Sequence, residues 1–97
     1  MEDREYLIIL YDYYGELLSD IQKEYFELYY FDNLSLSEIS ENDGKSRNAI
    51  HKCIKSSSSK LYEYEDKLGL YEKRCKLDKL IDKISDNELK EKLRELV

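Results

Sequence analysis

Three serines stand three residues before a glutamine or a glutamate, a spacing that marks the start of a helix. The pairs are Ser19 with Gln22, Ser35 with Glu38, and Ser85 with Glu88. In such a pair the serine oxygen accepts a free backbone N–H of the first turn, while the longer side chain reaches back to the backbone of the serine. We therefore expect a new helix to start at each serine, which favours an all-helical chain.

Apolar side chains recur at helical spacing on both sides of Ser19. The apolar face of the expected first helix consists of Leu7, Leu10, Tyr11, Tyr14, Leu17 and Leu18. Gly15 lies inside this helix and weakens it only slightly. The apolar face of the expected second helix consists of Ile21, Tyr25, Leu28 and Tyr29. We expect that helix to end at Asp32-Asn33.

The segment from residue 35 to about residue 60 predicts a short helix, a turn and a second helix. Residues 42–44 (Asn-Asp-Gly) stop the short helix, because Gly44 readily takes the left-handed conformation of a turn. Ser46 can then cap the second helix. The four serines at 56–59 compete for backbone hydrogen bonds. We interpret them as solvated helix surface or a frayed turn, with a serine-rich linker as the alternative.

Residues 61–97 predict further helices that pack on this unit. Apolar stripes at spacings of three and four consist of Leu61, Tyr64, Leu68, Tyr71 and Cys75, then Leu77, Leu80, Ile81 and Ile84, and finally Leu89, Leu93 and Leu96. Gly69 either breaks or bends the first stripe, and the sequence leaves both open. We predict one all-α domain over residues 1–97, with about six helices, a helix-turn-helix at about 35–60 and a C-terminal helical extension at 61–97.

Charge is segregated along the chain, whose net charge is −6. Residues 1–44 carry twelve acids and two bases, residues 45–60 carry five bases and no acid, and residues 61–97 carry ten acids and nine bases. Local field, rather than total charge, decides where a phosphate backbone can lie. The stretch 45–60 is therefore suited to bind a polyanion. The acidic remainder should weaken non-specific binding and make it sensitive to salt.

The segment from residue 35 to about residue 60 has the side chains that a helix-turn-helix needs at its small, apolar and turn positions. These positions are taken by Ile39, Ser40, Gly44 and Ile50. The candidate nucleic-acid-binding residues are Ser46, Arg47, Asn48, His51, Lys52 and Lys55. We expect Arg47 and Asn48 to reach base edges and the other four to hold phosphates. The alternative is an ordinary helical hairpin whose exposed face happens to be basic.

Other kinds of site find little support in the sequence. Cys53 and Cys75 are too few and too far apart for a disulfide framework or a zinc site, and two unpaired thiols fit a reducing cytoplasm. The start Met-Glu-Asp-Arg-Glu is unlike a signal peptide, and no apolar run approaches the length of a membrane span. Acidic pairs such as Asp12 with Glu16 have no nucleophile or histidine beside them. We expect no catalytic site, metal, cofactor or membrane insertion.

Three segments of the chain resemble the YlxM family of small bacterial proteins. They are residues 17–40, residues 46–50 (Ser-Arg-Asn-Ala-Ile) and residues 62–70 (Tyr-Glu-Tyr-Glu-Asp-Lys-Leu-Gly-Leu), so that the resemblance covers roughly residues 5–75. It implies an all-helical fold whose helix-turn-helix is similar to region 4 of bacterial sigma factors, with its recognition helix starting at Ser46. Genes of this family commonly neighbour those of the signal recognition particle, and its members are described as regulators or accessory factors of that pathway.

The chain departs from the family pattern around the turn. Asp43 stands where the family usually has an apolar residue, and Lys45 where it favours valine or isoleucine. Ser56 and Ser57 replace a basic and a polar residue. We expect Asp43 and Lys45 to remove side chains that pin the two helices together, which would weaken sequence-specific DNA binding without harming the fold.

Two hypotheses of function follow from these patterns. The leading one is a non-enzymatic, cytoplasmic regulatory protein that binds DNA or the RNA of the signal recognition particle. It would act as an accessory factor of that pathway, with protein components of the particle as further partners. The second is a protein-interaction or dimerisation module that keeps the helix-turn-helix fold without specific DNA binding. In that case the apolar stripes between residues 61 and 84 pair two copies or dock a partner.

Overall fold

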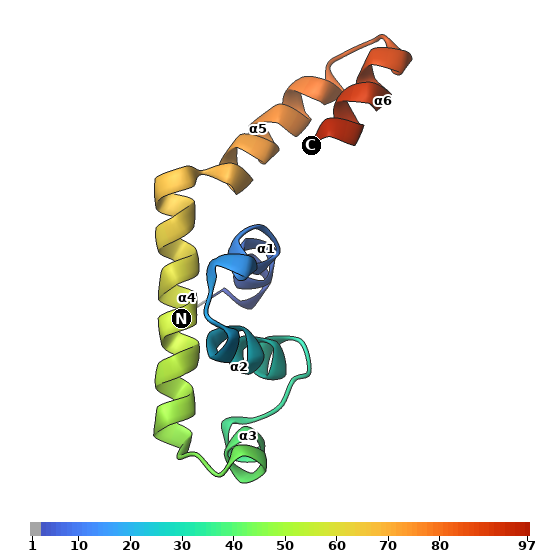
Figure 1. Cartoon of the computed structure of the whole chain (residues 1–97). Helices are drawn as coiled ribbons and strands as arrows, with labels where there is room; N and C mark the ends of the chain where they lie inside the picture. The colour runs from blue at the N-terminus through green and yellow to red at the C-terminus, as the bar shows by residue number, and fades with distance from the viewer. Residues whose placement is uncertain (1–2) are drawn as a thin grey trace.

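The computed structural model describes residues 3–97, which form six α-helices, one short 3-10 turn and no strand. The elements are α1 (Arg4–Tyr14), η1 (Gly15–Leu17), α2 (Asp20–Tyr30), α3 (Leu36–Asp43), α4 (Arg47–Leu68), α5 (Leu70–Asp82) and α6 (Asn87–Leu96). Figure 1 shows α4 as a long upright helix, with α1, α2 and α3 stacked along one side and α5 and α6 leaning out from its upper end. The expected all-α class is confirmed. Met1 and Glu2, which open the acidic start of the chain, lie outside the described residues.

Two of the three expected serine caps are confirmed. The backbone N–H of Gln22 donates to Ser19 Oγ at 3.3 Å, and Gln22 Oε1 accepts from the Ser19 N–H at 3.0 Å. Ser35 and Glu38 form the same reciprocal pair, with both distances at 3.1 Å. The cap expected at Ser85 is wrong. Asp86 caps α6 instead, because its extended backbone lets its carboxylate accept from two N–H groups of the first turn.

The first helix is shorter than expected, since α1 ends at Tyr14 and the chain tightens into η1. The ring of Tyr11 packs against Gly15, so that a Cβ at this position would lie 3.0 Å from the ring and push it aside by a few tenths of an ångström. Leu17, assigned to the apolar face, is 55% exposed, whereas Leu18 is buried. This tight turn sends α2 back beside α1.

The buried face of α2 is rotated from the expected one. Phe26 and Tyr30 are buried, whereas Ile21 is exposed; only Tyr25 was assigned correctly to the fully buried set. The reason is that α2 packs on α4, α3 and α1 at once. It lies against α4, and the ring of Phe26 stacks on that of Tyr11 of α1 with centroids 4.5 Å apart and planes 5° from parallel. We call α1 to α4 the body of the molecule. Its core forms around the stacked rings of Phe26 and Tyr11. Its largest fully buried side chains are Tyr14, Tyr25, Phe26, Leu7, Leu10, Ile39, Ile50 and Leu61.

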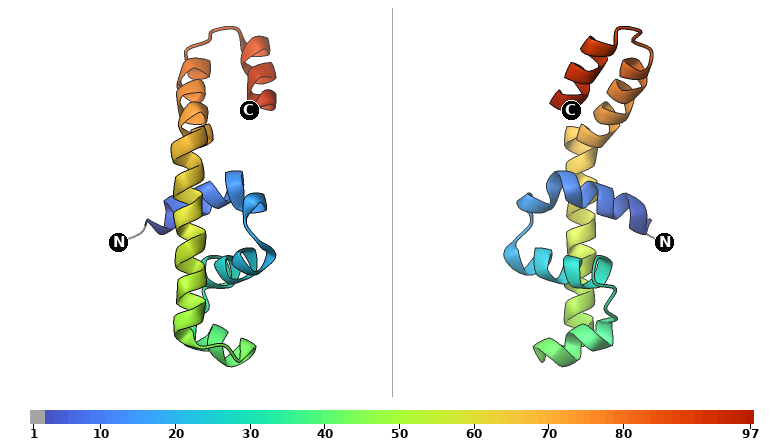
Figure 2. Two further views of the ribbon diagram at one scale, coloured as in Figure 1. Left: turned by 60° about the vertical axis from the view of Figure 1, so that its left-hand side comes forward. Right: turned by 90° about the vertical axis from the view of Figure 1, so that its right-hand side faces the viewer.

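The serine run does not interrupt α4, which continues through residues 56–59 as one helix of 22 residues. Ser57 and Ser58 are fully buried, so their assignment to solvated surface is wrong. Each hydroxyl donates to the carbonyl four residues earlier, at 2.9 Å and 3.1 Å, which satisfies it without a partner from another helix. Figure 2 shows α1 and α2 crossing α4, and small side chains on α4 let crossing backbones approach closely.

A hydrogen-bonded corner joins α4 to α5 at Gly69. The φ of +62° at Gly69 ends α4. The expected apolar stripe from Leu61 to Cys75 is therefore broken at this residue. The Glu65 carboxylate accepts from the Tyr14 hydroxyl at 2.6 Å and from the N–H groups of Tyr71 and Glu72 at 3.1 Å each. Tyr14 in turn accepts from the Leu70 N–H at 3.0 Å. Burial alone would raise the pKa of Glu65, but these hydrogen bonds outweigh it and lower that pKa. Burial, and then the bond to Glu65, raise the pKa of Tyr14 to about 12.

The hairpin, defined here as α5 and α6, projects from the body (Figure 1). Its only fully buried side chain is Ile81, and Leu80 of the same expected stripe is exposed. The molecule is consequently elongated, 56 × 24 × 24 Å, with a radius of gyration of 17.2 Å. A compact domain of this length would have a radius of about 12.5 Å. No helix in residues 3–97 combines the length and apolar character needed to cross a bilayer.

Candidate nucleic-acid interface

The helix-turn-helix is built by α3, α4 and the turn between them. Ile39 of α3 and Ile50 of α4 are fully buried against each other's helices and the core, as the expected register requires. Gly44 has a φ of +69° with open space around the position of a Cβ, so backbone conformation alone explains the glycine. Ser46 caps α4 by accepting from the Ala49 N–H at 3.1 Å. The first turn of α4 is therefore held in a defined direction.

The turn is held by polar contacts. They replace the apolar contacts that Asp43 and Lys45 were expected to remove. The Tyr25 hydroxyl of α2 donates to the Asp43 carboxylate, and the Lys45 ammonium lies 5.4 Å from the centroid of the Tyr25 ring. The hydroxyl of Ser40 donates to the carbonyl of Lys45. The bond to Asp43 raises the pKa of Tyr25, and the Tyr25 hydroxyl raises the pKa of Lys45. Both departures from the family pattern thus anchor the turn to α2.

All six candidate side chains, from Ser46 to Lys55, are exposed. None of the cations among them forms an ion pair within residues 3–97. Their charges are therefore available to an external anion. Three bases in the first three turns of one helix, with no acid among them, make this end of α4 a local positive field in an acidic protein.

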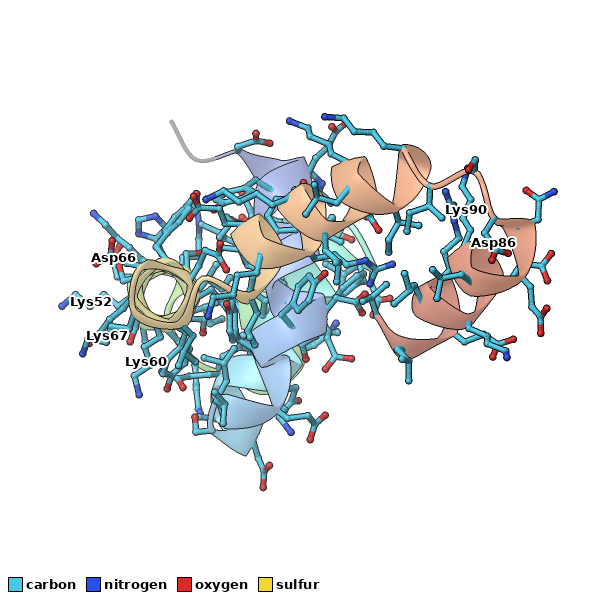
Figure 3. The ribbon with its side chains drawn as sticks, turned by 90° about the horizontal axis from the view of Figure 1, so that it is seen from above. Lys52, Lys60, Asp66, Lys67, Asp86 and Lys90 are labelled. Atoms are coloured by element: carbon cyan, nitrogen blue, oxygen red, sulfur yellow. The ribbon has the colours of Figure 1, made fainter. Side chains whose placement is uncertain are left out.

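The structure brings four of the six candidates together in a shallow hollow of about 570 Å³. It is lined by Leu36, Ser46, Arg47, Asn48 and His51. A second hollow of about 240 Å³ lies on the other side of His51 and is lined by Tyr29, Tyr30, Leu36, His51, Ile54 and Lys55. Lys52 borders neither hollow. It projects from the outer side of α4, away from α1 and α2, as Figure 3 shows.

Sequence reasoning missed Lys60, which projects from the same outer side of α4 as Lys52 (Figure 3). Eight residues separate the two, or about 12 Å along the helix axis. Lys60 has no ion pair within residues 3–97, whereas Lys67, about two turns further on, is held by Glu63 at 2.8 Å. The signal in the sequence was the absence of any acid from residue 45 to residue 60, which becomes informative only if the serine run is helical.

No three histidine, cysteine, aspartate or glutamate side chains in residues 3–97 are grouped in a way that could hold a metal ion. His51 lies between the two hollows, and Cys53 is half-buried on the other side of the helix. Burial raises the pKa of the Cys53 thiol. The arrangement is suited to contact an extended anionic ligand with exposed donors.

Comparison with known proteins shows the family to which the chain is similar. A family model described as "Putative helix-turn-helix protein, YlxM / p13 like" matches residues 1–97. A UPF0122 protein of Ureaplasma urealyticum serovar 10 is 45% identical over 93 residues, which cover 96% of this chain and 94% of that protein. A UPF0122 protein of Clostridium novyi is 48% identical over 92 residues, covering 91% and 80%. One of Caldanaerobacter subterraneus is 42% identical over 85 residues, covering 88% and 73%.

Proposed function

The chain belongs to the YlxM/p13-like helix-turn-helix family, and from this premise we propose that it binds nucleic acid through α4. One observation carries the proposal: the exposed face of α4 from Ser46 to Lys60 has no acid, although the rest of the chain is strongly acidic. Such a face attracts phosphates, while the acidic surface elsewhere repels them and limits binding to this one orientation.

The exposed side chains of α4 fall into three groups according to their position on the helix. Arg47 and Asn48 lie in the first turn, where side chains of a recognition helix reach base edges; arginine suits guanine and asparagine suits adenine. Ser46, His51 and Lys55 border the two hollows, and they are suited to hold phosphate or sugar. Lys52 and Lys60 on the outer side extend the phosphate contacts along the helix (Figure 3).

The finer part of the proposal concerns the pathway. It is supported by the resemblance to YlxM proteins, whose genes commonly neighbour those of the signal recognition particle. The ligand proposed is DNA or the RNA of that particle, and the role is that of a regulatory accessory factor that binds without catalysis. The proposed compartment is the cytoplasm, where the free thiols of Cys53 and Cys75 would persist. Residues 1–97 are proposed to act as one domain, because α4 belongs both to the helix-turn-helix and to the corner that carries the hairpin.

A second candidate function, a protein-interaction module, is favoured by a different observation. The hairpin exposes several leucines at the opposite end of the molecule from Ser46. That surface can serve association whether or not α4 binds nucleic acid.

The experiment compares two double variants that each remove two positive charges. Arg47→Ala with Lys52→Ala removes the proposed contacts, and Lys79→Ala with Lys83→Ala removes two exposed cations of α5 and its end, as a matched control. Fluorescence anisotropy measures the affinity for a DNA duplex and for the RNA of the signal recognition particle over a range of salt concentrations. We expect the first variant to bind more weakly and its salt slope to fall by about 1 for each phosphate that it no longer binds, while the control keeps the wild-type slope. Equal losses of affinity in both variants would contradict the assignment to α4.

A further inference from the structure

The hairpin leaves most of its leucines exposed to solvent. Ile81 is its one fully buried side chain among the described residues, whereas Leu80 is 61% and Leu96 is 81% exposed. Leu70 and Leu89 are also exposed. Leu89, Leu93 and Leu96 share one side of α6, so the exposed leucines of α6 form a stripe rather than scattered points.

An apolar hollow of about 260 Å³ opens beside α5. It is lined by Tyr13, Leu70, Lys73, Arg74, Leu77 and Val97. The polar heads at its edge belong to Lys73 and Arg74, whose long stems cover apolar surface. A hollow of this kind next to protruding leucines is self-complementary, because one copy offers both the side chain to be buried and the space to receive it.

The charge pattern favours the hairpin, rather than either other part of the chain, as the surface that meets a second copy. Residues 70–97 carry seven acids and eight bases, a net charge of only +1, so two hairpins repel each other little. The N-terminal helices, with twelve acids in residues 1–44, and the basic end of α4 would each repel their own copies. Ion pairs within the hairpin already tie up much of its charge, including Arg74 with Asp78 at 3.3 Å and Lys92 with Glu88 at 3.2 Å.

We propose that two copies of this chain associate through their hairpins, whose four helices form an antiparallel bundle with Leu80, Leu89 and Leu96 inside. Four-helix bundles of this kind bury apolar side chains that project from facing helices. The contact is isologous, with the same surface used by both copies, and it closes as a dimer. Because α3 and the first turns of α4 lie at the far end of the molecule, the dimer leaves both helix-turn-helix units free (Figure 1).

This association does not rest on nucleic-acid binding, so its test uses the purified chain alone. Sedimentation velocity over a wide concentration range compares the wild type with Leu80→Glu, Leu96→Glu and with a matched control, Leu17→Glu, Ile21→Glu. Both variants replace two exposed apolar side chains by glutamate, but the control changes the body instead. We expect the wild type and the control to be dimers and the hairpin variant to be a monomer with the wild-type helical content by circular dichroism. A monomeric wild type, or a hairpin variant that stays dimeric, would overturn the proposal; the former result would leave the leucines to another protein.

A mixing experiment keeps the test decisive if the glutamate variant loses helical content. Leu80→Lys, Leu96→Lys is prepared as a second hairpin variant. If residues 80 and 96 of the two copies face one another, an equimolar mixture of the lysine and glutamate variants forms a dimer, although each variant alone is monomeric. A mixture that stays monomeric would refute this face-to-face arrangement.

Discussion

The body and the hairpin are both made of amphipathic helices, yet they are stabilised differently. In the body, three helices press on α4 from one side, and large aromatic side chains are buried between them. In the hairpin, α6 packs chiefly on α5, and one isoleucine is fully buried. The difference shows that an apolar stripe does not by itself tell how a helix is covered. The body completes its core within one chain, whereas the hairpin leaves leucines for a second surface.

The largest expected effect is a cavity in the body. Phe26→Ala removes a fully buried ring that stacks on Tyr11, and we expect it to lower the free energy of unfolding by about 3–5 kcal/mol. Leu80→Ala, at an exposed position of the hairpin, is the counterpart. In the monomer, at concentrations below dimerisation, it should change that free energy by no more than about 0.5 kcal/mol. Urea unfolding followed by circular dichroism measures both. Similar losses of unfolding free energy in the two variants would contradict the contrast between a packed body and an exposed hairpin.

The next effect tests the close crossing of helices on α4. Ser58→Leu adds volume at a fully buried position, and we expect a loss of about 1–3 kcal/mol in the free energy of unfolding, because α1 and α2 must move away. Ser59→Leu makes the same change at the exposed neighbouring position and serves as the control. Thermal unfolding should show a lower midpoint for the first variant only. Equal midpoints would mean that α4 tolerates large side chains where α1 and α2 cross it.

A smaller effect is expected at the joint between body and hairpin. Gly69→Ala places a Cβ on a residue with a φ of +62°, which costs about 1–2 kcal/mol. Gly44→Ala imposes the same strain at a φ of +69° in the turn before α4. We expect hydrogen exchange to become faster in the hairpin for the first variant and in α3 for the second. Faster exchange throughout the chain in both cases would show that body and hairpin unfold together.

The smallest effect concerns the carboxylate at that joint. Glu65→Gln weakens three hydrogen bonds, and we expect a loss of about 1 kcal/mol at neutral pH. The folded-state pKa of Glu65 lies below its unfolded value, so the contribution is complete above the unfolded pKa of about 4.3 and disappears as the pH falls through the folded pKa. The variant should therefore lose less stability than the wild type on acidification below pH of about 4. Glu41→Gln, an exposed carboxylate of α3, is the control, and an acid dependence unchanged by Glu65→Gln would refute this role of the corner.

Features set by neighbours in the sequence were predicted best. The reciprocal caps at Ser19 and Ser35 and the left-handed Gly44 depend on three or four consecutive residues, and local backbone chemistry is enough to specify them. The exposed, basic start of α4 followed from the same rules together with a count of charges. The error at Ser85 was also local: Asp86 is an equally good cap one residue later.

Features set by packing were predicted less well. Ile21 fits the period of α2 as well as Phe26 does, and only the positions of α1 and α4 make Phe26 the buried one. Lys60 belongs to the basic face only because α4 continues through the serines, and that depends on the helices that cross it.

The sequence by itself therefore determined the all-helical class, the starts of α2, α3 and α4, the helix-turn-helix and the place of its positive charge, because each depends on contacts within a few residues. Only the tertiary structure decided that Ser57 and Ser58 are interior and that Asp43 and Lys45 anchor the turn through Tyr25. It also decided that α5 packs on α1 through Tyr71 while four leucines of the hairpin stay exposed. The physical reason is that burial and long-range hydrogen bonds depend on which distant segments of the chain come into contact. The periodicity of apolar residues shows which face of a helix is apolar, but it does not show which other segment packs on that face.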